Sequence, residues 1–244
     1  MAGEDKTAIV TGAASGIGSA TCASLLESGY RVLGIDRTEG DMSLPAAYSH
    51  VALDITDFDR LAGVVGVDFT PGDVNLLVNC AGQREICHTR KLSHTEFRGI
   101  LNVNTTSVFV ASQAFCERLI GASVAGAIVN VASVAAFLGE PNRTAYVTSK
   151  HAVIGLTKQF AVDYAQFAIR ANAVAPGVIR TPLTEQYFTD DDQMDRIRRG
   201  QLVADFGTTA DVVRAIRFLS APDATFVTGS TVFVDGGWSA SKVL

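Results

Sequence analysis

The feature that most constrains the fold of this chain is a series of short, almost wholly apolar runs rich in β-branched residues, separated by longer segments of helical character. The runs are Thr7 to Thr11, Arg31 to Ile35, Val51 to Leu53, Val74 to Val78, Ala127 to Val131, Arg170 to Val174 and Thr231 to Val234. Strands that are apolar throughout, rather than alternating, are typical of a parallel sheet covered on both faces. The pattern predicts an α/β fold, a single doubly wound domain over residues 1–244 with a seven-stranded parallel sheet flanked by helices.

Two local patterns mark helix starts, and one connection is too short for a helix. Ser93 to Glu96 and Thr208 to Asp211 each have the form of a capping box, in which side chains satisfy the free N–H groups of a helix start. Thr38 to His50 is the whole connection between the second and third runs and contains Pro45. We therefore expect an abbreviated crossover there, without a full helix.

Composition and charge exclude several classes of function. The net charge is −5 and no cluster of Lys and Arg occurs, so neither nucleic acid nor an acidic membrane surface is expected as a partner. No apolar run approaches the roughly 20 residues that span a bilayer, and no signal-type stretch opens the chain, which predicts a cytoplasmic protein. The spacings of Cys22, Cys80, Cys87 and Cys116 fit neither a redox pair nor a zinc site, so we expect no metal and mostly buried, reduced thiols.

A glycine-rich segment follows the first run and precedes a helix predicted from Ser19 to Ser28. The segment reads Thr11-Gly12-Ala13-Ala14-Ser15-Gly16-Ile17-Gly18. Gly12 permits a tight turn, Gly16 lets the backbone approach a pyrophosphate, and Gly18 allows close packing of helix on strand. The free N–H groups at the helix start, around Ser15 and Ile17, attract the anion. An ordinary glycine-rich turn is the alternative, but this position between strand and helix favours a Rossmann-type dinucleotide site.

Residues at the ends of the next runs are predicted to complete the cofactor site. The Asp36 carboxylate can accept hydrogen bonds from the adenosine ribose and repel the extra phosphate of NADP, which favours NAD, although Arg37 could cradle that phosphate. Asp54 and Ile55 are placed to reach the adenine, with a helix N-cap as the alternative role of Asp54. The small residues of Asn79, Cys80, Ala81 and Gly82 let the backbone pass close beside the cofactor.

Tyr146 and Lys150 are spaced i and i+4, which places both side chains on one face of a helix. A phenol has a reference pKa of about 10, so it serves as an acid or base near neutrality only if a positive charge stabilises its phenolate. Lys150 can supply that charge and can also hydrogen-bond the nicotinamide ribose, so Tyr146 and Lys150 are both predicted to contact the cofactor. The pair alone is common on exposed helices, and its interpretation depends on the other motifs.

Together with Asn104, Ser133 and Pro176-Gly177, these motifs occur in an order and spacing that resemble the short-chain dehydrogenase/reductase family across essentially the whole chain. The resemblance implies that Tyr146 is the general acid and base, Ser133 orients the substrate oxygen, Lys150 lowers the pKa of Tyr146, and Asn104 holds a water in a proton relay. It further implies a set of residues beside the nicotinamide: Pro176, Gly177, Ile179 and Thr181. It also implies a homotetramer or homodimer. Cys80 departs from the family, which commonly has Asn there, and a small thiol should fit.

The predicted function is therefore an NAD-dependent oxidoreductase that interconverts a small, cyclic secondary alcohol and its ketone by hydride transfer. Two alternatives stay open. One is a 3-oxoacyl-thioester reductase that uses NADP(H), disfavoured by Asp36. The other is a non-catalytic NAD(H)-binding sensor or scaffold, disfavoured by the complete set of Asn104, Ser133, Tyr146 and Lys150.

Three segments are expected to form the substrate walls: Gln83 to Arg90, Val134 to Arg143 and Leu183 to Val203. The last is rich in Asp and Arg and is expected to act as a mobile lid with solvated charges. Arg84 and Arg143 could bind an anionic substrate or be plain surface charges, and surface charge is favoured. His88 lies on a predicted wall and is not expected to contact substrate.

Overall fold

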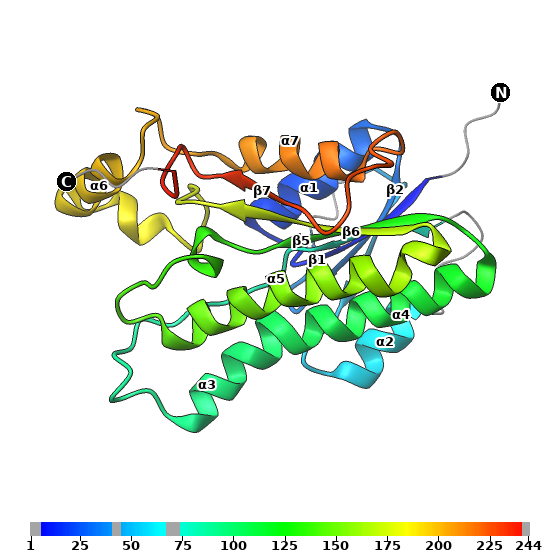
Figure 1. The fold of residues 1–244 in the computed structure, drawn as a ribbon, viewed down its shortest axis with the longest axis horizontal. Helices are drawn as coiled ribbons and strands as arrows, with labels where there is room; N and C mark the ends of the chain where they lie inside the picture. The colour runs from blue at the N-terminus through cyan, green and yellow to red at the C-terminus, as the bar shows by residue number, and fades with distance from the viewer. Residues whose placement is uncertain (1–5, 41–44, 67–73, 241–244) are drawn as a thin grey trace.

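Seven parallel strands form the central sheet of the computed structural model, which describes residues 6–40, 45–66 and 74–240 (Figure 1). The strands are β1 (Thr7–Thr11), β2 (Arg31–Asp36), β3 (Tyr48–Ala52), β4 (Val74–Asn79), β5 (Gly126–Val131), β6 (Ile169–Pro176) and β7 (Thr231–Val234). Their order across the sheet is β3-β2-β1-β4-β5-β6-β7, and each pair of neighbours is parallel. The predicted doubly wound, seven-stranded Rossmann-type sheet is confirmed.

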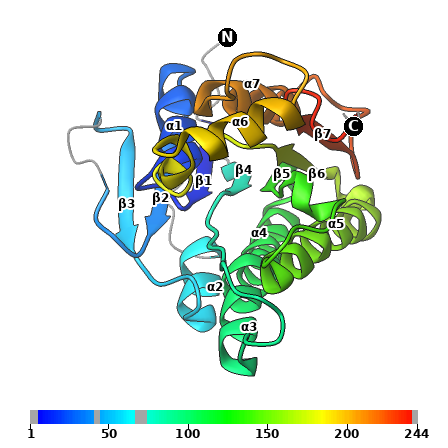
Figure 2. The same cartoon turned by 90° about the vertical axis from the view of Figure 1, so that its left-hand side faces the viewer.

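Helices cover both faces of the sheet, as Figure 1 and Figure 2 show. The helices are α1 (Gly16–Glu27), α2 (Phe58–Gly66), α3 (His94–Leu101), α4 (Ser107–Ala122), α5 (Thr144–Tyr164), α6 (Asp191–Gly200) and α7 (Thr209–Ser220). α1 and α7 pack together on one face, and α2, α4 and α5 cover the other. A π-helical turn, η1 (Asn102–Thr106), joins α3 to α4. Among the described residues, no helix has the length and apolar character needed to cross a bilayer.

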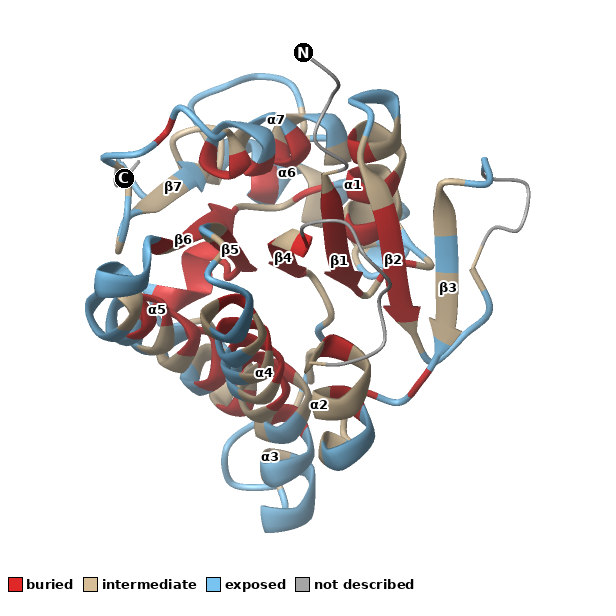
Figure 3. Ribbon diagram, turned by 90° about the vertical axis from the view of Figure 1, so that its right-hand side faces the viewer, coloured by how far each residue is buried: buried red, intermediate tan, exposed pale blue. Residues whose placement is uncertain are grey.

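The strands are apolar throughout because alternate side chains enter two different cores. Ile9 and Leu77 belong to the core under α2, α4 and α5, which also contains Phe115. Their neighbours Val10 and Val78 belong to the core under α1 and α7. Figure 3 shows the result, with the central strands buried along most of their length and β3, at the edge of the sheet, only partly buried.

The chain reverses its direction across the sheet between β1 and β4. From β1 it proceeds outward through β2 to β3, and from β4 it proceeds the other way to β7. Ligands of open α/β sheets bind at such a switch point, in the crevice outside the carboxyl ends of the strands. The topology therefore places a binding site next to the residues that follow β1 and β4.

The local predictions place the elements correctly, but several boundaries are shifted; α1 begins at Gly16 rather than Ser19, for example. Ser93 Oγ accepts from the N–H of Glu96 (3.2 Å), and the Glu96 carboxylate accepts from the N–H of Ser93 (3.0 Å), so this capping box forms. The third strand begins at Tyr48 rather than Val51, because an edge strand includes polar positions that a search for apolar runs misses. Residues 38–40 and 45–47 contain no helix, as expected for the short crossover, and residues 41–44 lie outside the described part.

The glycine-rich turn requires glycine for two different reasons. Gly12 has a φ of +70°, and a Cβ there would lie 2.8 Å from the Cα of Ala81. Gly18 has no such backbone requirement, but a Cβ there would lie 2.0 Å from the Gly12 carbonyl oxygen. The start of α1 is therefore packed directly against the turn that precedes it.

This packing predicts opposite effects for two glycine substitutions. We expect Gly18→Ala to lower the free energy of unfolding by about 1–3 kcal/mol, because the added methyl group has no space. Gly99→Ala is the matched control: in α3 a Cβ meets nothing within 4 Å, and alanine in a helix stabilises by about 0.5–1 kcal/mol. Urea unfolding of both variants checks this, and equal stability changes in the two would contradict the packing.

Candidate active site

A cavity of about 370 Å³ opens at the carboxyl ends of β1, β2 and β4. The predicted cofactor residues on its wall are Gly12, Ser15, Gly16, Ile17, Gly18, Asp36, Arg37, Asp54, Ile55, Ala81, Gly82 and Thr181. Residues not predicted to bind cofactor complete the wall: Leu53, Cys80, Gln83, Val103, Pro182 and Leu183. The fold thus brings together segments that lie far apart in the sequence, and their contact with a cofactor stays a prediction.

Asp36 connects the end of β2 to the glycine-rich turn. Its Oδ2 accepts from the N–H of Ala14 (3.1 Å), and its Oδ1 accepts from the N–H and the hydroxyl of Thr38 (both 3.1 Å). Its carboxylate therefore sits at the edge of the cavity in a fixed orientation. Arg37 is exposed beside it on the same wall.

Asp54 lies on the cavity wall and does not cap α2. Hydrogen bonds from the N–H (2.9 Å) and hydroxyl (2.8 Å) of Thr56 hold the pKa of Asp54 below its usual value, and the positive charge of Arg37 contributes less. Near the helix start it is Asp57 that accepts a hydrogen bond, from the N–H of Arg60 (3.3 Å). The alternative interpretation of Asp54 as a helix N-cap is therefore wrong.

Six predicted cofactor residues lie off the cavity wall: Tyr146 and Lys150, described below, and Asn79, Pro176, Gly177 and Ile179. Asn79 points into the interior, where its Nδ2 donates to Asn130 Oδ1 (2.8 Å) and Ser112 Oγ (3.2 Å). Pro176 pairs with Val234 at the end of β6, and the N–H of Gly177 donates to the Val234 carbonyl (3.0 Å). Ile179 is buried and forms a bridge with Gly207. These last four residues hold the strand ends in place, and the contact of all six with a cofactor stays a prediction.

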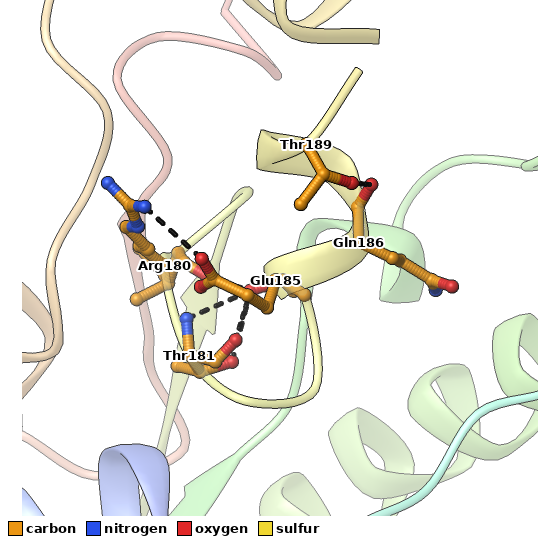
Figure 4. A network of polar contacts seen from close by, with 7 residues as sticks. Arg180, Thr181, Glu185, Gln186 and Thr189 are labelled. Atoms are coloured by element: carbon orange, nitrogen blue, oxygen red, sulfur yellow. Dashed lines mark hydrogen bonds and ion pairs between the residues drawn. The ribbon is translucent and has the colours of Figure 1, made fainter.

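The segment after β6 is fixed by a polar network around Thr181 (Figure 4). The N–H of Thr181 donates to the Thr184 hydroxyl (2.9 Å), and Arg180 forms an ion pair with Glu185 (3.2 Å). Farther along, the Thr189 hydroxyl donates to the Gln186 carbonyl (3.0 Å). The network presents Thr181 to the cavity, opposite Gly16.

Ser133 and Tyr146 meet at the end of β5. Ser133 is buried ahead of the 3₁₀ turn η2 (Val134–Ala136), where its Oγ accepts from the N–H of Ala135 (3.1 Å). Burial raises the pKa of the Tyr146 phenol, while a hydrogen bond with the Ser133 side chain lowers it. The Ser133 hydroxyl is therefore close enough to Tyr146 to affect its pKa, as expected of a hydroxyl and an acid or base that act on the same substrate oxygen.

Lys150 lies one turn after Tyr146 on α5, with its ammonium 5.8 Å from the centre of the Tyr146 ring. Its Nζ donates to the Val131 carbonyl (2.8 Å) and lies 3.6 Å from the place that a Cβ on Gly82 would occupy. Burial lowers the pKa of Lys150 to about 8. The ammonium therefore borders the cavity wall at Gly82, and its effect on the pKa of Tyr146 stays a prediction.

Asn104 occupies the π-helical turn η1 and is fully buried. Its Oδ1 accepts from the N–H of Gln83 (2.9 Å), and its Nδ2 donates to the Gln83 carbonyl (2.7 Å) and to Ser149 Oγ (2.9 Å). Ser149 Oγ in turn donates to the carbonyl of Tyr146 (2.7 Å). Asn104 thus joins the cavity wall to the helix that carries Tyr146, and π-helical turns of this kind are frequent at functional sites.

Glu85 belongs to the site, although the sequence predicted it only as part of the substrate wall Gln83 to Arg90. Its carboxylate accepts from the N–H of Ala145 (2.7 Å) and of Tyr146 (3.0 Å), the first residues of α5. A carboxylate at a helix N-terminus satisfies free N–H groups and interacts favourably with the helix dipole. No local motif could have indicated this, because Ala145 lies 60 positions from Glu85 in the sequence.

Arg84 and Arg143 converge on the phenol oxygen of Tyr187, which lies in the 3₁₀ turn η4 (Glu185–Phe188). Arg84 Nη1 donates to it (2.8 Å), and Arg143 Nη2 also donates to it. Arg143 is only 6% exposed, so its interpretation as a surface charge is wrong. Both arginines lower the pKa of Tyr146, whose largest shift is the rise caused by burial.

The predicted lid, Leu183 to Val203, contains η4 and α6. Asp190 caps α6 through its Oδ1, which accepts from the N–H of Asp192 (2.9 Å), while Arg198 and Arg199 lie in the last turn. These charges complement the helix dipole, whereas the sequence predicted only that they are solvated. Movement of the segment as a lid stays a prediction.

The remaining candidate groups take no part in the site or only border it. His88 is exposed, off the cavity wall, and accepts from the N–H of Arg90 (3.2 Å). All four cysteines are free, and Cys80 lies on the cavity wall with its pKa raised to about 12 by burial. In the described ranges, no group of His, Cys, Asp and Glu is arranged to hold a metal ion.

Curated relatives match nearly the full length of the chain. It is 35% identical to 2-(R)-hydroxypropyl-CoM dehydrogenase from Xanthobacter autotrophicus, over 96% of this chain and 99% of that protein. It is 35% identical to 3-oxoacyl-(acyl-carrier-protein) reductase from Thermotoga maritima, over 96% and 98%. It is 34% identical to cyclopentanol dehydrogenase from a Comamonas species, over 97% and 98%.

Solved structures share the fold and hold nicotinamide cofactors. A structure of 4-hydroxyisoleucine dehydrogenase complexed with NADH matches with a TM-score of 0.92 and 36% identity, over 98% of this chain and 100% of that chain. A complex of that enzyme with NADH and succinate matches with a TM-score of 0.88 and 34% identity, over 96% and 100%. ElxO with NADP bound matches with a TM-score of 0.88 and 30% identity, over 98% and 100%.

The family model described as short chain dehydrogenase matches residues 6–192. The match covers most of the chain and includes every catalytic residue predicted from the sequence. Together with the full-length relatives, it shows that this chain is an oxidoreductase that belongs to the short-chain dehydrogenase/reductase family.

Proposed function

We propose that this protein is an NAD-dependent dehydrogenase that interconverts a small secondary alcohol and its ketone, with Tyr146 as general acid and base. The observation that carries the proposal is the juxtaposition of three groups. The Ser133 side chain at the end of β5 lies close enough to Tyr146 to lower its pKa, and the Lys150 ammonium lies 5.8 Å from the centre of the Tyr146 ring, beside Gly82 on the cavity wall.

The cavity fits a dinucleotide. The glycine-rich turn presents backbone without side chains to the cavity, since a side chain at Gly12 or Gly18 would collide with neighbouring backbone. Gly16 and Ile17, at the start of α1, also line the wall. An anionic pyrophosphate is favoured at such a helix start. When bound, the nicotinamide ring supplies the acceptor or donor of hydride.

The choice of NAD over NADP depends on Asp36. Its carboxylate is held at the cavity edge by Ala14 and Thr38, where it can accept hydrogen bonds from ribose hydroxyls and repel a phosphate. Arg37 on the same wall favours NADP instead, because its positive charge could bind the extra phosphate. Relatives of known structure hold NADH in one case and NADP in another, so the proposal depends on the residues of this chain.

The Tyr146 hydroxyl is the group that gives a proton to the substrate oxygen or takes one from it. Burial keeps the phenol protonated in the free protein, which suits donation to a carbonyl oxygen. In the reverse direction the phenolate accepts the alcohol proton, and cationic neighbours stabilise it. With a pKa of about 8, Lys150 is mostly an ammonium at neutral pH and can play this part. Ser133 orients the substrate oxygen, and Asn104, through Ser149, positions the helix that carries Tyr146.

We propose a cyclic alcohol as the first substrate class to test, since cyclopentanol dehydrogenase is among the relatives. A 3-oxoacyl reductase is equally similar, which keeps thioester reduction as the second candidate. A purely binding role is disfavoured because a binder has no need of the Ser133 and Tyr146 pair. Action in the cytoplasm, assembly as a homotetramer or homodimer, and a single domain over residues 1–244 stay predictions.

Removal of one oxygen tests the proton-transfer role. We expect Tyr146→Phe to lower kcat for cyclic alcohols by about 10²- to 10⁴-fold, because no group remains to exchange the proton. NADH should still bind, as measured by fluorescence titration, because the glycine-rich turn and Asp36 are unchanged. Tyr164→Phe is the matched control, since Tyr164 ends the same helix and stacks on Phe160 (5.3 Å between ring centres). Wild-type turnover in Tyr146→Phe would disprove the assignment.

Neutralisation of Asp36 tests the cofactor choice. We expect wild type to have a higher kcat/KM with NAD than with NADP, and Asp36→Asn to shift that ratio toward NADP by at least about tenfold, because the repulsive charge is lost. Asn keeps an acceptor for the N–H of Ala14. Steady-state kinetics with both cofactors, and with an acetoacetyl thioester plus NADPH, provide the measurement. Wild-type turnover with NADP that equals or exceeds turnover with NAD would exclude the NAD assignment.

A further inference from the structure

Two arginines meet beside the reactive tyrosine without a carboxylate to balance them. Arg84 follows the cavity residue Gln83, and Arg143 directly precedes α5, three residues before Tyr146. Within residues 6–40, 45–66 and 74–240, the ion pairs join Arg180 to Glu185, Arg198 to Asp195 and Arg214 to Asp211. Neither Arg84 nor Arg143 is among them, although Arg143 is buried.

The hydrogen bonds that hold the two guanidinium groups all end on neutral oxygens, and the Arg84 guanidinium also lies over the Tyr187 ring (4.5 Å to the ring centre). Arg84 donates to the Tyr187 hydroxyl (2.8 Å) and to the Leu183 carbonyl. Arg143 donates to the Tyr187 hydroxyl and to the Glu85 carbonyl, while the Glu85 carboxylate is used at the start of α5. Such contacts fix the direction of the two guanidinium groups. They do not balance the two positive charges, because neither arginine forms an ion pair within the described residues. A buried charge without a counter-charge is costly, and a bound anion removes that cost.

Glu140 is the acidic residue whose carboxylate could neutralise the two arginines in place of a bound anion. Burial raises the pKa of Glu140, and the positive charges of Arg143 and Arg84 lower it by smaller effects. Its carboxylate is not within ion-pair distance of either arginine, since the described ion pairs do not include it. The field of Glu140 therefore only partly offsets the two guanidinium groups.

The cluster borders the cavity and acts on the reacting hydroxyl. Leu183, whose carbonyl binds Arg84, lies on the cavity wall, and both arginines are close enough to Tyr146 to lower its pKa against the larger effect of burial. An anionic group bound there would place the rest of a small molecule beside Tyr146. Arginine binds carboxylates with a planar fork of donors, and two forks on one side specify a carboxylate more strongly than one.

We propose that Arg84, Arg143 and Tyr187 form an anion subsite for a carboxylate of the substrate, so that the alcohol oxidised here is a hydroxy acid. This inference rests on the proposed function and narrows its substrate class. Among the cyclic alcohols proposed above, it selects those that carry a carboxylate at a distance from the hydroxyl. The Tyr187 hydroxyl, an acceptor for both arginines, has its own proton left to donate to that carboxylate.

A binding comparison tests the subsite independently of turnover. Cyclohexanecarboxylate and cyclohexanecarboxamide have the same shape and differ in charge, and their dissociation constants for the protein–NADH complex are measured by calorimetry. We expect wild type to bind the carboxylate about tenfold to a hundredfold more tightly than the amide. Arg84→Met and Arg143→Met should each remove most of this difference while NADH affinity stays unchanged.

Arg214→Met is the matched control, because Arg214 lies on α7, away from the cavity wall, is exposed and pairs with Asp211 (2.6 Å). It should keep the preference for the carboxylate. Equal or undetectable binding of the carboxylate by wild type, or a preference that survives in Arg84→Met, would overturn the anion subsite. Failure of wild type to bind NADH would instead refute the proposed function, so the two failures are distinguishable.

Discussion

The structure depends on one short stretch of backbone, Ala81 to Glu85, which leaves β4 at the point where the sheet reverses direction. Each of its residues binds a different part of the site. Ala81 receives the glycine-rich turn, with its N–H donating to Thr11 Oγ1 (3.3 Å), and Gly82 faces the Lys150 ammonium. This stretch joins the cofactor half of the sheet to the catalytic half, because β4, which it follows, lies between β1 and β5 in the sheet.

The same stretch aligns the catalytic helix. Gln83 pairs through its backbone with the Asn104 amide, Arg84 reaches Tyr187, and Glu85 caps the start of α5. Tyr146 is therefore oriented from both sides, by the cap at its own N–H and by Ser149 at its carbonyl. Supporting hydrogen bonds of this kind keep a reacting group in position, and they explain why a buried Asn belongs with the hydroxyl groups of the site.

Features of the fold and site that depend on local sequence could be predicted, and those that depend on distant partners could not. Strands covered on both faces are visible in the sequence as apolar runs. The need for glycine is also partly local, because Gly12 has a φ of +70° within the turn and a Cβ on Gly18 would meet the Gly12 carbonyl oxygen, although Gly12 additionally packs on the distant Ala81. The start of β3 was missed because Tyr48 and His50 are polar residues of an edge strand. The burial of Arg143 was missed because its partners lie 44 and 58 positions away, where sequence spacing carries no information.

Tyr146 and its neighbours are proposed to direct hydride transfer between a substrate carbon and a bound nicotinamide. An alcohol deuterated at the carbinol carbon, such as deuterated hydroxycyclohexanecarboxylate, incubated with the protein and NAD, follows that hydride. We expect the reduced cofactor to carry the deuterium and oxidation to be slower than with the protium compound. Reduced cofactor without deuterium, or deuterium released to the solvent, would contradict this hydride transfer.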